Sequence, residues 1–273
     1  MGLAAMVFAA LLACSDADGP VAAGDEGPRP ELGLMGTIPI YWGESAGLGE
    51  MLNGQADSHW ARAELERSFR LAPLDVLDET SLASLDYLLL AQPRALLPEE
   101  NVALDAWARA GGRLLLFADP MMTGHSRYGL GDRRRPQDVI LLSPLLTHWG
   151  LELQFVEDQS AGVQTREIAG MGVPVDLPGQ FVIAGHSRAC TLDAGGVLAR
   201  CRLGDGMAVI WADAAVIDLE NHAPEPARAL HALVQEAFEV GEDAGREATA
   251  RQEHDDSSKL PTRMNADTAR DHM

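Results

Sequence analysis

One short stretch of the sequence has the residue types that nucleophilic catalysis requires. Residues 181–189, FVIAGHSRA, end in Gly-His-Ser-Arg-Ala, one residue away from the Gly-x-Ser-x-Gly elbow of α/β-hydrolases. In such an enzyme Ser187 would attack an acyl carbon, and a histidine oriented by a carboxylate would take its proton. The downstream residues of the right types are Asp213, Asp218, His222 and His231.

Three features count against this serine hydrolase. The elbow must lead into a helix, but the Gly195-Gly196 pair lies within the segment that would have to form it. Glycine in a helix interior is destabilising. Ala189 replaces the last glycine of the motif, and its Cβ would crowd a strained turn. Gly-His-Ser-Arg also occurs at 124–127 with no strand directly before it. We therefore favour a non-catalytic protein and keep the serine hydrolase as the alternative.

A second candidate site is suited to binding. Residues 121–138, MMTGHSRYGLGDRRRPQD, follow a predicted strand, and open α/β sheets bind ligands beyond the carboxyl ends of their strands. An island of positive charge on an acidic protein predicts contact with an anionic ligand or an acidic partner. The alternative is that its arginines pair with Asp132 and Asp138. The candidate contact residues are Asp119, His125, Arg127, Arg133, Arg134 and Arg135.

The sequence shows no recognised pattern for a metal or a cofactor. Asp119, His125 and Asp132 lie close in sequence, but neither His-x3-His nor Cys-x2-Cys occurs. Residues 129–132, GLGD, lack the spacing and the lysine of a phosphate-binding loop. We therefore expect neither a metal nor a cofactor.

Cys190 and Cys201 flank the segment TLDAGGVLAR. A two-residue hairpin turn at Gly195-Gly196 would place them directly opposite each other, and opposed residues of antiparallel strands lie within disulfide reach. Export would permit the bond, whereas two reduced cysteines would pack in the core. The sequence leaves both states open, and the pair is structural in either case.

The elements that must position these residues alternate along the chain. Apolar runs at 36–44, 73–78, 85–93 and 113–118 predict strands, and the unbroken runs indicate burial on both faces, as in parallel sheets. Amphipathic segments at 59–71, 98–110, 143–149 and 225–238 predict helices. After the 143–149 helix, 151–158 is a further strand, so we expect a second helix–strand unit of a doubly wound sheet. From about Gly170, strands separated by glycine turns indicate antiparallel additions to the sheet.

The segment ALDAWARAGGRLLLFADP contains the clearest local signals. Pro98 suits the first position of a helix, Gly111 suits its end, and the next strand stops at Asp119-Pro120. The face of this helix that we expect to be buried consists of Val102, Ala106, Trp107 and Ala110.

Net charge excludes one class of function. The 273 residues carry a formal charge of -20 and have a pI of about 4.6. Such a surface repels phosphate backbones, so we expect no nucleic-acid partner.

The N-terminus predicts a location. Residues 1–13, MGLAAMVFAALLA, are uncharged and apolar, and LLAC ends at Cys14 in the form of a bacterial lipobox, although no Lys or Arg precedes the apolar run. We expect lipidation at Cys14 and anchoring to a membrane of the bacterial cell envelope, on the periplasmic side. The expected organisation is a signal peptide at 1–14, a flexible tether at 15–33, one α/β domain at 34–240 and a disordered acidic tail at 241–273.

The order of these motifs resembles the auxiliary periplasmic domain of ABC-type transport systems, best known from the gliding-motility type. The likeness covers about residues 36–220. The matching residues are Pro93, Leu96, Pro98, Glu99, Glu100, Gly111, Gly112, Asp119, Pro120, Leu145, Leu146, Trp149 and Gly150, with the later run LGDGMAVIWADAAVID. Leu97 departs from the family's helix-capping serine.

This resemblance implies a fold like the class I glutamine amidotransferases, which is a flavodoxin-like α/β sandwich. It implies an accessory role in an envelope assembly, with ABC-type permease or ATPase subunits or other envelope proteins as partners. Amidotransferases place a cysteine on a sharp strand-to-helix turn. This chain has no such cysteine, which counts against that chemistry.

Overall fold

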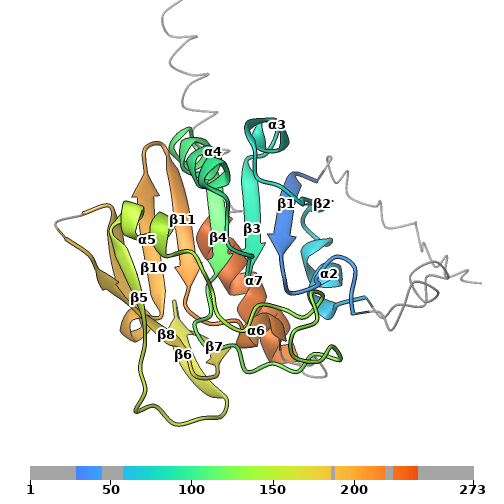
Figure 1. Ribbon diagram of the computed structural model, residues 1–273, viewed down its shortest axis with the longest axis vertical. Helices are drawn as coiled ribbons and strands as arrows, with labels where there is room; N and C mark the ends of the chain where they lie inside the picture. The colour runs from blue at the N-terminus through green and yellow to red at the C-terminus, as the bar shows by residue number, and fades with distance from the viewer. Residues whose placement is uncertain (1–28, 45–57, 186–187, 219–223, 239–273) are drawn as a thin grey trace, which may run out of the picture.

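Figure 1 shows the computed structural model of the chain, which describes residues 29–44, 58–185, 188–218 and 224–238. Within these residues, one seven-stranded sheet organises the fold. Its strands, in spatial order, are β2 (Arg70–Pro73), β1 (Glu31–Gly36), β3 (Tyr87–Ala91), β4 (Arg113–Phe117), β11 (Gly206–Trp211), β10 (Leu198–Leu203) and β9 (Cys190–Asp193).

The first five strands of this order are parallel to one another, and β10 is antiparallel to both β11 and β9. The parallel part follows the 2-1-3-4-5 order of flavodoxin-like folds. The predicted fold class is therefore confirmed, including the antiparallel strands late in the chain. The central strands are unbroken apolar runs because both of their faces are covered: 88–90, 114–116 and 209–211 are wholly buried.

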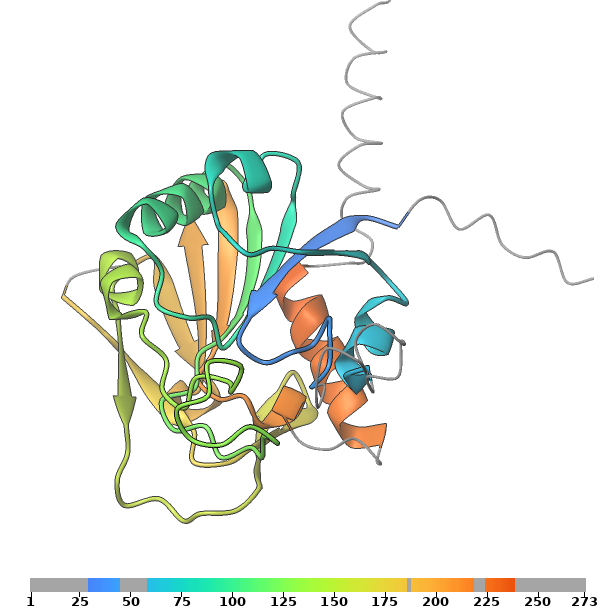
Figure 2. The same cartoon turned by 45° about the vertical axis from the view of Figure 1, so that its right-hand side comes forward.

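Two helical layers cover the sheet (Figures 1 and 2). The layer on one face contains α3 (Glu79–Leu82), α4 (Pro98–Arg109) and α5 (Ser143–Trp149). The layer on the other contains α2 (Trp60–Leu65) and α7 (Pro224–Phe238), with the short α6 (Ala215–Asp218) beside α7. The predicted inward residues of α7 are all buried: Leu230, Leu233, Val234, Ala237 and Phe238.

Two small sheets lie outside the main one. Strand β5 (Leu151–Phe155) pairs antiparallel with β8 (Gly179–Ile183), and β6 (Gln164–Ile168) pairs with β7 (Met171–Val175). The prediction that the strand after α5 continues the doubly wound pattern is wrong. Strand β5 alternates between covered and exposed side chains, so it cannot be buried on both faces of a central sheet.

Several predicted boundaries near the N-terminus are also wrong. Strand β1 begins at Glu31, inside the predicted tether, and 37–44 is a loop. The predicted helix at 59–71 ends at Leu65, and β2 occupies 70–73 in place of a strand at 73–78. Phe69 continues the helical spacing of Ala61 and Leu65 and is buried like them, so apolar periodicity alone does not mark the end of this helix.

Helix α4 has the predicted ends, but most of the face predicted to be buried is exposed. It buries Leu104 and Ala108, whereas Val102 is 70% exposed. The cause is Glu100, whose buried carboxylate accepts hydrogen bonds from Arg94 at 2.7 and 2.8 Å and from the Leu97 backbone N–H at 2.8 Å. These bonds hold Glu100 inward and turn Val102, Ala106 and Ala110 towards solvent. Trp107 alone of the predicted face packs against the core.

The predicted signal peptide at 1–14 with Cys14, Ser187, His222 and the tail at 241–273 lie outside the described residues. Every helix in the described part of the chain is too short or too polar to cross a bilayer.

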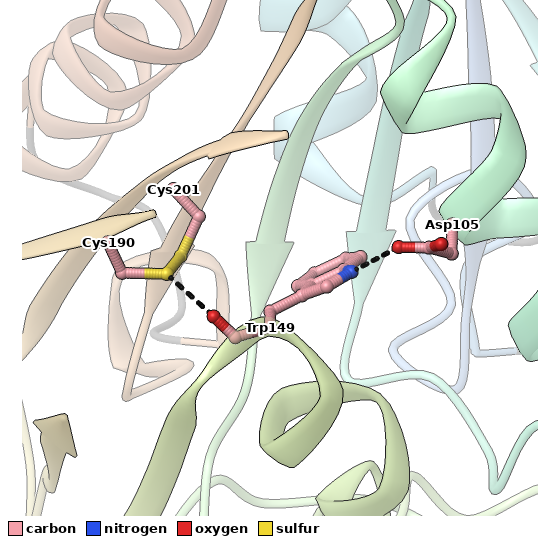
Figure 3. The surroundings of a disulfide bond; sticks show 4 residues. All are labelled: Asp105, Trp149, Cys190 and Cys201. Carbon is pink, nitrogen blue, oxygen red and sulfur yellow. Dashed lines mark hydrogen bonds between the residues drawn. A yellow bond between two sulfur atoms is a disulfide. The ribbon is translucent and has the colours of Figure 1, made fainter. Parts of the chain in front are cut away.

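Strands β9 and β10 are joined by a disulfide between Cys190 and Cys201, which are register partners (Figure 3). The turn is not the predicted two-residue type: residues 194–197 connect the strands. Gly195 and Gly196 have φ of 72° and 91°, a conformation that favours glycine.

The disulfide belongs to a line of contacts that crosses the helical layer. The Cys190 sulfur lies 3.4 Å from the Trp149 carbonyl oxygen, and the Trp149 indole Nε1 donates to Asp105 of α4 at 2.8 Å (Figure 3). A disulfide sulfur carries no hydrogen, so the first interaction is a contact. The bond therefore fastens the antiparallel edge next to α5.

We expect reduction of this disulfide to lower the free energy of unfolding by about 2–3 kcal/mol, because the bond closes a short loop and so restricts the unfolded chain only moderately. Urea unfolding with and without a phosphine reductant measures the loss. The Cys190→Ala/Cys201→Ala variant should unfold at the same urea concentration as the reduced wild type, and its midpoint should not change when the reductant is added. Identical wild-type midpoints in both conditions would contradict the assignment.

Candidate functional site

The loops that leave the carboxyl ends of β1, β3, β4 and β11 form one connected edge. The Thr37 hydroxyl, just after β1, donates to the Gln92 carbonyl oxygen and accepts the Gln137 backbone N–H at 2.9 Å. Backbone bonds from Met122 to Asp138 and from Ile140 to Asp119 close the base of the loop that follows β4. This is the edge at which open α/β sheets bind ligands, and we call it the carboxyl edge.

Gln92 occupies the sharp turn directly after β3. It is wholly buried and has φ of 49°, which is unusual for a residue with a side chain. Its amide Nε2 donates to the carbonyl oxygens of Asp119 and Gln137, and its Oε1 accepts the Asp119 N–H at 2.8 Å. A position of this kind holds the nucleophile in elbow enzymes. Here it holds an amide that fixes the backbone.

Asp119 follows β4 and is 1% exposed. Its Oδ1 accepts the Met121 backbone N–H at 2.7 Å, and its Oδ2 accepts that of Ala214 at 3.0 Å. Burial raises the pKa of Asp119 to about 7, against the opposing effect of these two donors. The side chain therefore ties the loop after β4 to the segment after β11.

Asp213, which follows β11, likewise ties two backbone segments together. It is wholly buried, and its carboxylate accepts the backbone N–H groups of Ala215 at 2.7 Å and Asp176 at 3.0 Å. Burial raises the pKa of Asp213 well above its usual range, and the neighbouring Asp119 charge raises it further. Both buried aspartates thus act as acceptors for loop backbone.

The outer part of the edge is acidic as well. Glu44 accepts the Ser126 hydroxyl at 2.6 Å and the Arg127 backbone N–H at 2.8 Å. Burial and the charge of Glu44 raise the pKa of Asp218 to about 6, while His125 and Arg135 lower it. The Asp218 carboxylate covers Gly124 so closely that a Cβ there would lie 1.1 Å from it.

His59 completes the edge from the start of α2. Its Nδ1 accepts the Ala61 backbone N–H at 3.2 Å. Burial lowers the pKa of His59 to about 4, although a backbone hydrogen bond to Ile217 and the charge of Glu44 raise it. The ring is therefore neutral at pH 7 and caps a helix.

The arginines of residues 121–138, which we call the edge loop, divide into two groups. Arg134 pairs with Asp132 at 2.7 Å, and Arg135 pairs with Asp138 at 3.1 Å, as the local-pairing alternative expects. The Arg127 guanidinium lies 4.0 Å from Glu44, and Arg133 is exposed. Most of the positive charge is thus balanced within the loop.

The hydrolase alternative is not supported by the described residues. Strand β9 begins at Cys190, a few residues after β8 ends, where an elbow would need a helix. Asp213 is engaged with backbone, and His231 lies in a cleft between α2 and α7. Within the ranges that the structure describes, no three His, Cys, Asp or Glu side chains are arranged to hold a metal ion.

Glu44, His59, Gln92 and Asp176 belong to the edge but are absent from the sequence-based candidates. A signal for Gln92 existed: LLLAQP ends β3 as LLLFADP ends β4, so both strands lead through a polar residue into proline. No comparable signal precedes the other three.

The strand order and its carboxyl edge define a flavodoxin-like α/β protein. Residues 45–170 match the model of a family described as an ABC-type uncharacterized transport system, which confirms the resemblance expected from the sequence. No curated protein matches the chain in sequence.

Three solved structures are similar at low identity. The mmIFT52 N-terminal domain is 14% identical, with a TM-score of 0.48 over 78% of this chain and 98% of that one. A putative ThuA-like protein from Bacteroides uniformis is 8% identical, with a TM-score of 0.42 over 81% and 98%. An exo-beta-1,4-mannosidase from an Opitutaceae bacterium is 10% identical, with a TM-score of 0.46 over 77% of this chain and 36% of that one. This chain thus spans about a third of the mannosidase chain.

The raised pKa of Asp119 predicts a pH-dependent stability. Because the folded pKa of about 7 exceeds the ordinary 3.8, the folded state holds the proton more tightly, and this stabilisation is lost as pH rises from 4 to 7. We expect the stability advantage of wild type over Asp119→Asn to be greater at pH 4.5 than at pH 7.5, by roughly 2 kcal/mol.

Urea unfolding of both proteins at the two pH values tests this. The opposite effect of His59, whose folded pKa is lowered, is common to both proteins and cancels in the difference. An advantage that is constant or that increases with pH would contradict the raised pKa.

Proposed function

We propose that this protein is a non-catalytic accessory component of an ABC-type transport system and that the carboxyl edge contacts its ligand or partner. The family match over residues 45–170 carries the proposal. Two features of the edge support the absence of catalysis. The elbow position holds Gln92, whose amide is fully hydrogen-bonded to backbone, and both buried aspartates accept backbone N–H groups.

The edge loop supports a contact role because it displays apolar side chains to solvent. Leu130 is 85% exposed, and Met121, Val139 and Leu141 are also exposed. Such a loop, held at its base by Thr37, Gln92 and Asp119, presents a stable shape to a partner. The loop therefore combines a fixed base with an apolar tip.

The test is photo-crosslinking in the native host from a photoreactive residue at position 130, followed by mass spectrometry. We expect adducts with subunits of an ABC-type system. The control is position 192, which is also exposed but lies on β9, at the opposite end of the strand order from β1 and β3. Adducts with no such subunit from position 130, or equal yields from both positions, would overturn the proposed role of the edge.

We also propose that the chain is a lipoprotein of the cell envelope, anchored through Cys14. The support is the LLAC sequence after an apolar run. Mass spectrometry of the mature N-terminus should find a diacylglyceryl-modified Cys14. An unmodified Cys14 thiol behind an intact Met1 would overturn the anchor.

A further inference from the structure

Helix α4 presents an apolar stripe to solvent. Val102, Ala106 and Ala110 are exposed on the side of the helix away from the buried Leu104 and Ala108, and the half-buried Trp107 borders them. Val102 is 70% exposed. An apolar face of this kind usually packs against another element, but among the described residues only its Trp107 edge packs against the core.

The stripe forms one wall of a groove between α3 and α4, with a volume of about 1110 Å³. Val76 and Leu97 contribute exposed apolar surface, at 46% and 52%. The Trp107 indole is fixed by a 2.7 Å hydrogen bond from its Nε1 to the Leu85 carbonyl oxygen, so this wall is rigid. Alongside the 12 residues of α4, about 18 Å long, there is room for several turns of a second helix.

The charges around the groove all have one sign. Asp78, Glu79, Asp86 and Glu99 line it, and no lysine or arginine does. Glu100 also lines it, but its charge is balanced by Arg94. The floor is thus apolar and the rim anionic, which complements an amphipathic helix whose apolar face is bordered by Lys or Arg.

We propose that the α3–α4 groove docks a cationic amphipathic helix of a partner protein. None of the groove residues belongs to the carboxyl edge, so this is a second surface with a separate occupant. The apolar stripe supplies the contact area. The acidic rim favours a positively charged partner and accelerates its association.

The test titrates the full chain with a synthetic helix of leucine and lysine, about 18 residues long so that it is helical, and with a matched leucine and glutamate helix. We expect binding of the first peptide only. Val102→Arg should weaken it about tenfold or more, since it removes a central apolar contact and adds a repelling charge. Glu79→Gln/Glu99→Gln should weaken it severalfold and reduce its dependence on salt.

Two controls locate the site. Val163→Arg adds the same charge at another exposed valine and should leave affinity unchanged. Amide chemical shifts should move in α3 and α4 and not at the carboxyl edge. Equal binding of both peptides, an unaffected Val102→Arg variant or shifts confined elsewhere would overturn the proposal. A self-association that Val102→Arg abolishes would replace the partner with a second copy and would also overturn it.

These outcomes are independent of the proposed function. If crosslinks from position 130 fail but the cationic peptide still occupies the groove, the proposed contact role of the carboxyl edge is wrong and the groove assignment stands. If crosslinks succeed and the peptide does not bind, the contact role of the carboxyl edge stands and the groove assignment is wrong.

Discussion

The Asp213→Ala variant is expected to lose about 4 kcal/mol of unfolding free energy, because two backbone donors, one buried and one partly buried, lose their acceptor at once. The carboxylate of wild-type Asp213 accepts the N–H groups of Ala215 and Asp176. Each unsatisfied buried donor costs about 1–3 kcal/mol. Urea unfolding monitored by circular dichroism measures the loss.

The matched control is Asp205→Ala, at the turn before the same strand β11. The Asp205 side chain is exposed, and it is the backbone N–H of this residue that bonds to the Arg109 carbonyl oxygen. This substitution should change stability by less than about 0.5 kcal/mol. A loss below about 1 kcal/mol in Asp213→Ala would mean that water or a shifted loop satisfies the two donors.

The same variant probes the carboxyl edge. Asp213 links β11 to the start of α6 and to the end of β7, and Asp119 links the same segment to the loop after β4. Hydrogen exchange should therefore accelerate at Ala214, Ala215 and Asp176 in Asp213→Ala, while the amides of β3 stay protected. Unchanged exchange at those three amides would contradict the linking role.

Elements with local signals were predictable from the sequence. Helix α4 begins at Pro98 and ends before Gly111, and α5 ends at Gly150 with φ of 86°, because proline and glycine restrict or permit backbone conformations wherever they occur. Asp119 was found in the same way, since it ends an unbroken apolar run in a parallel sheet.

Features that depend on distant contacts were not predictable. The orientation of α4 is decided by Glu100, which Arg94 and the Leu77 backbone hold inward, and apolar periodicity alone contains no such information. Glu44, His59 and Asp176 reach the edge from loops, whose paths follow from tertiary packing. The residues of the candidate site were therefore predictable only where they directly follow a strand.

Gly36→Ala is expected to be comparably destabilising, for a steric reason. Gly36 is the last residue of β1 and pairs with Ala91 of β3. A Cβ on Gly36 would lie 2.0 Å from the Ala91 carbonyl oxygen and 2.8 Å from its carbon. Overpacking usually costs about 1–3 kcal/mol, and we expect about 4 here because the obstructing atoms are strand backbone and cannot rotate away.

The clash caused by Gly36→Ala should also disturb the base of the edge loop. Thr37 follows Gly36 directly, and its hydroxyl accepts the Gln137 N–H. If β1 moves away from β3, this contact opens, so amide exchange at Gln137 should accelerate along with the loss of stability. Urea unfolding and hydrogen exchange measure the two effects.

Gly129→Ala, within the edge loop, is the matched control, because a Cβ there meets nothing within 4 Å. We expect it to leave stability within about 0.5 kcal/mol of wild type and exchange at Gln137 unchanged. If Gly36→Ala unfolds at the same urea concentration as Gly129→Ala, β1 tolerates a side chain at its carboxyl end. The junction of β1 and β3 would then not be what holds the edge loop in place.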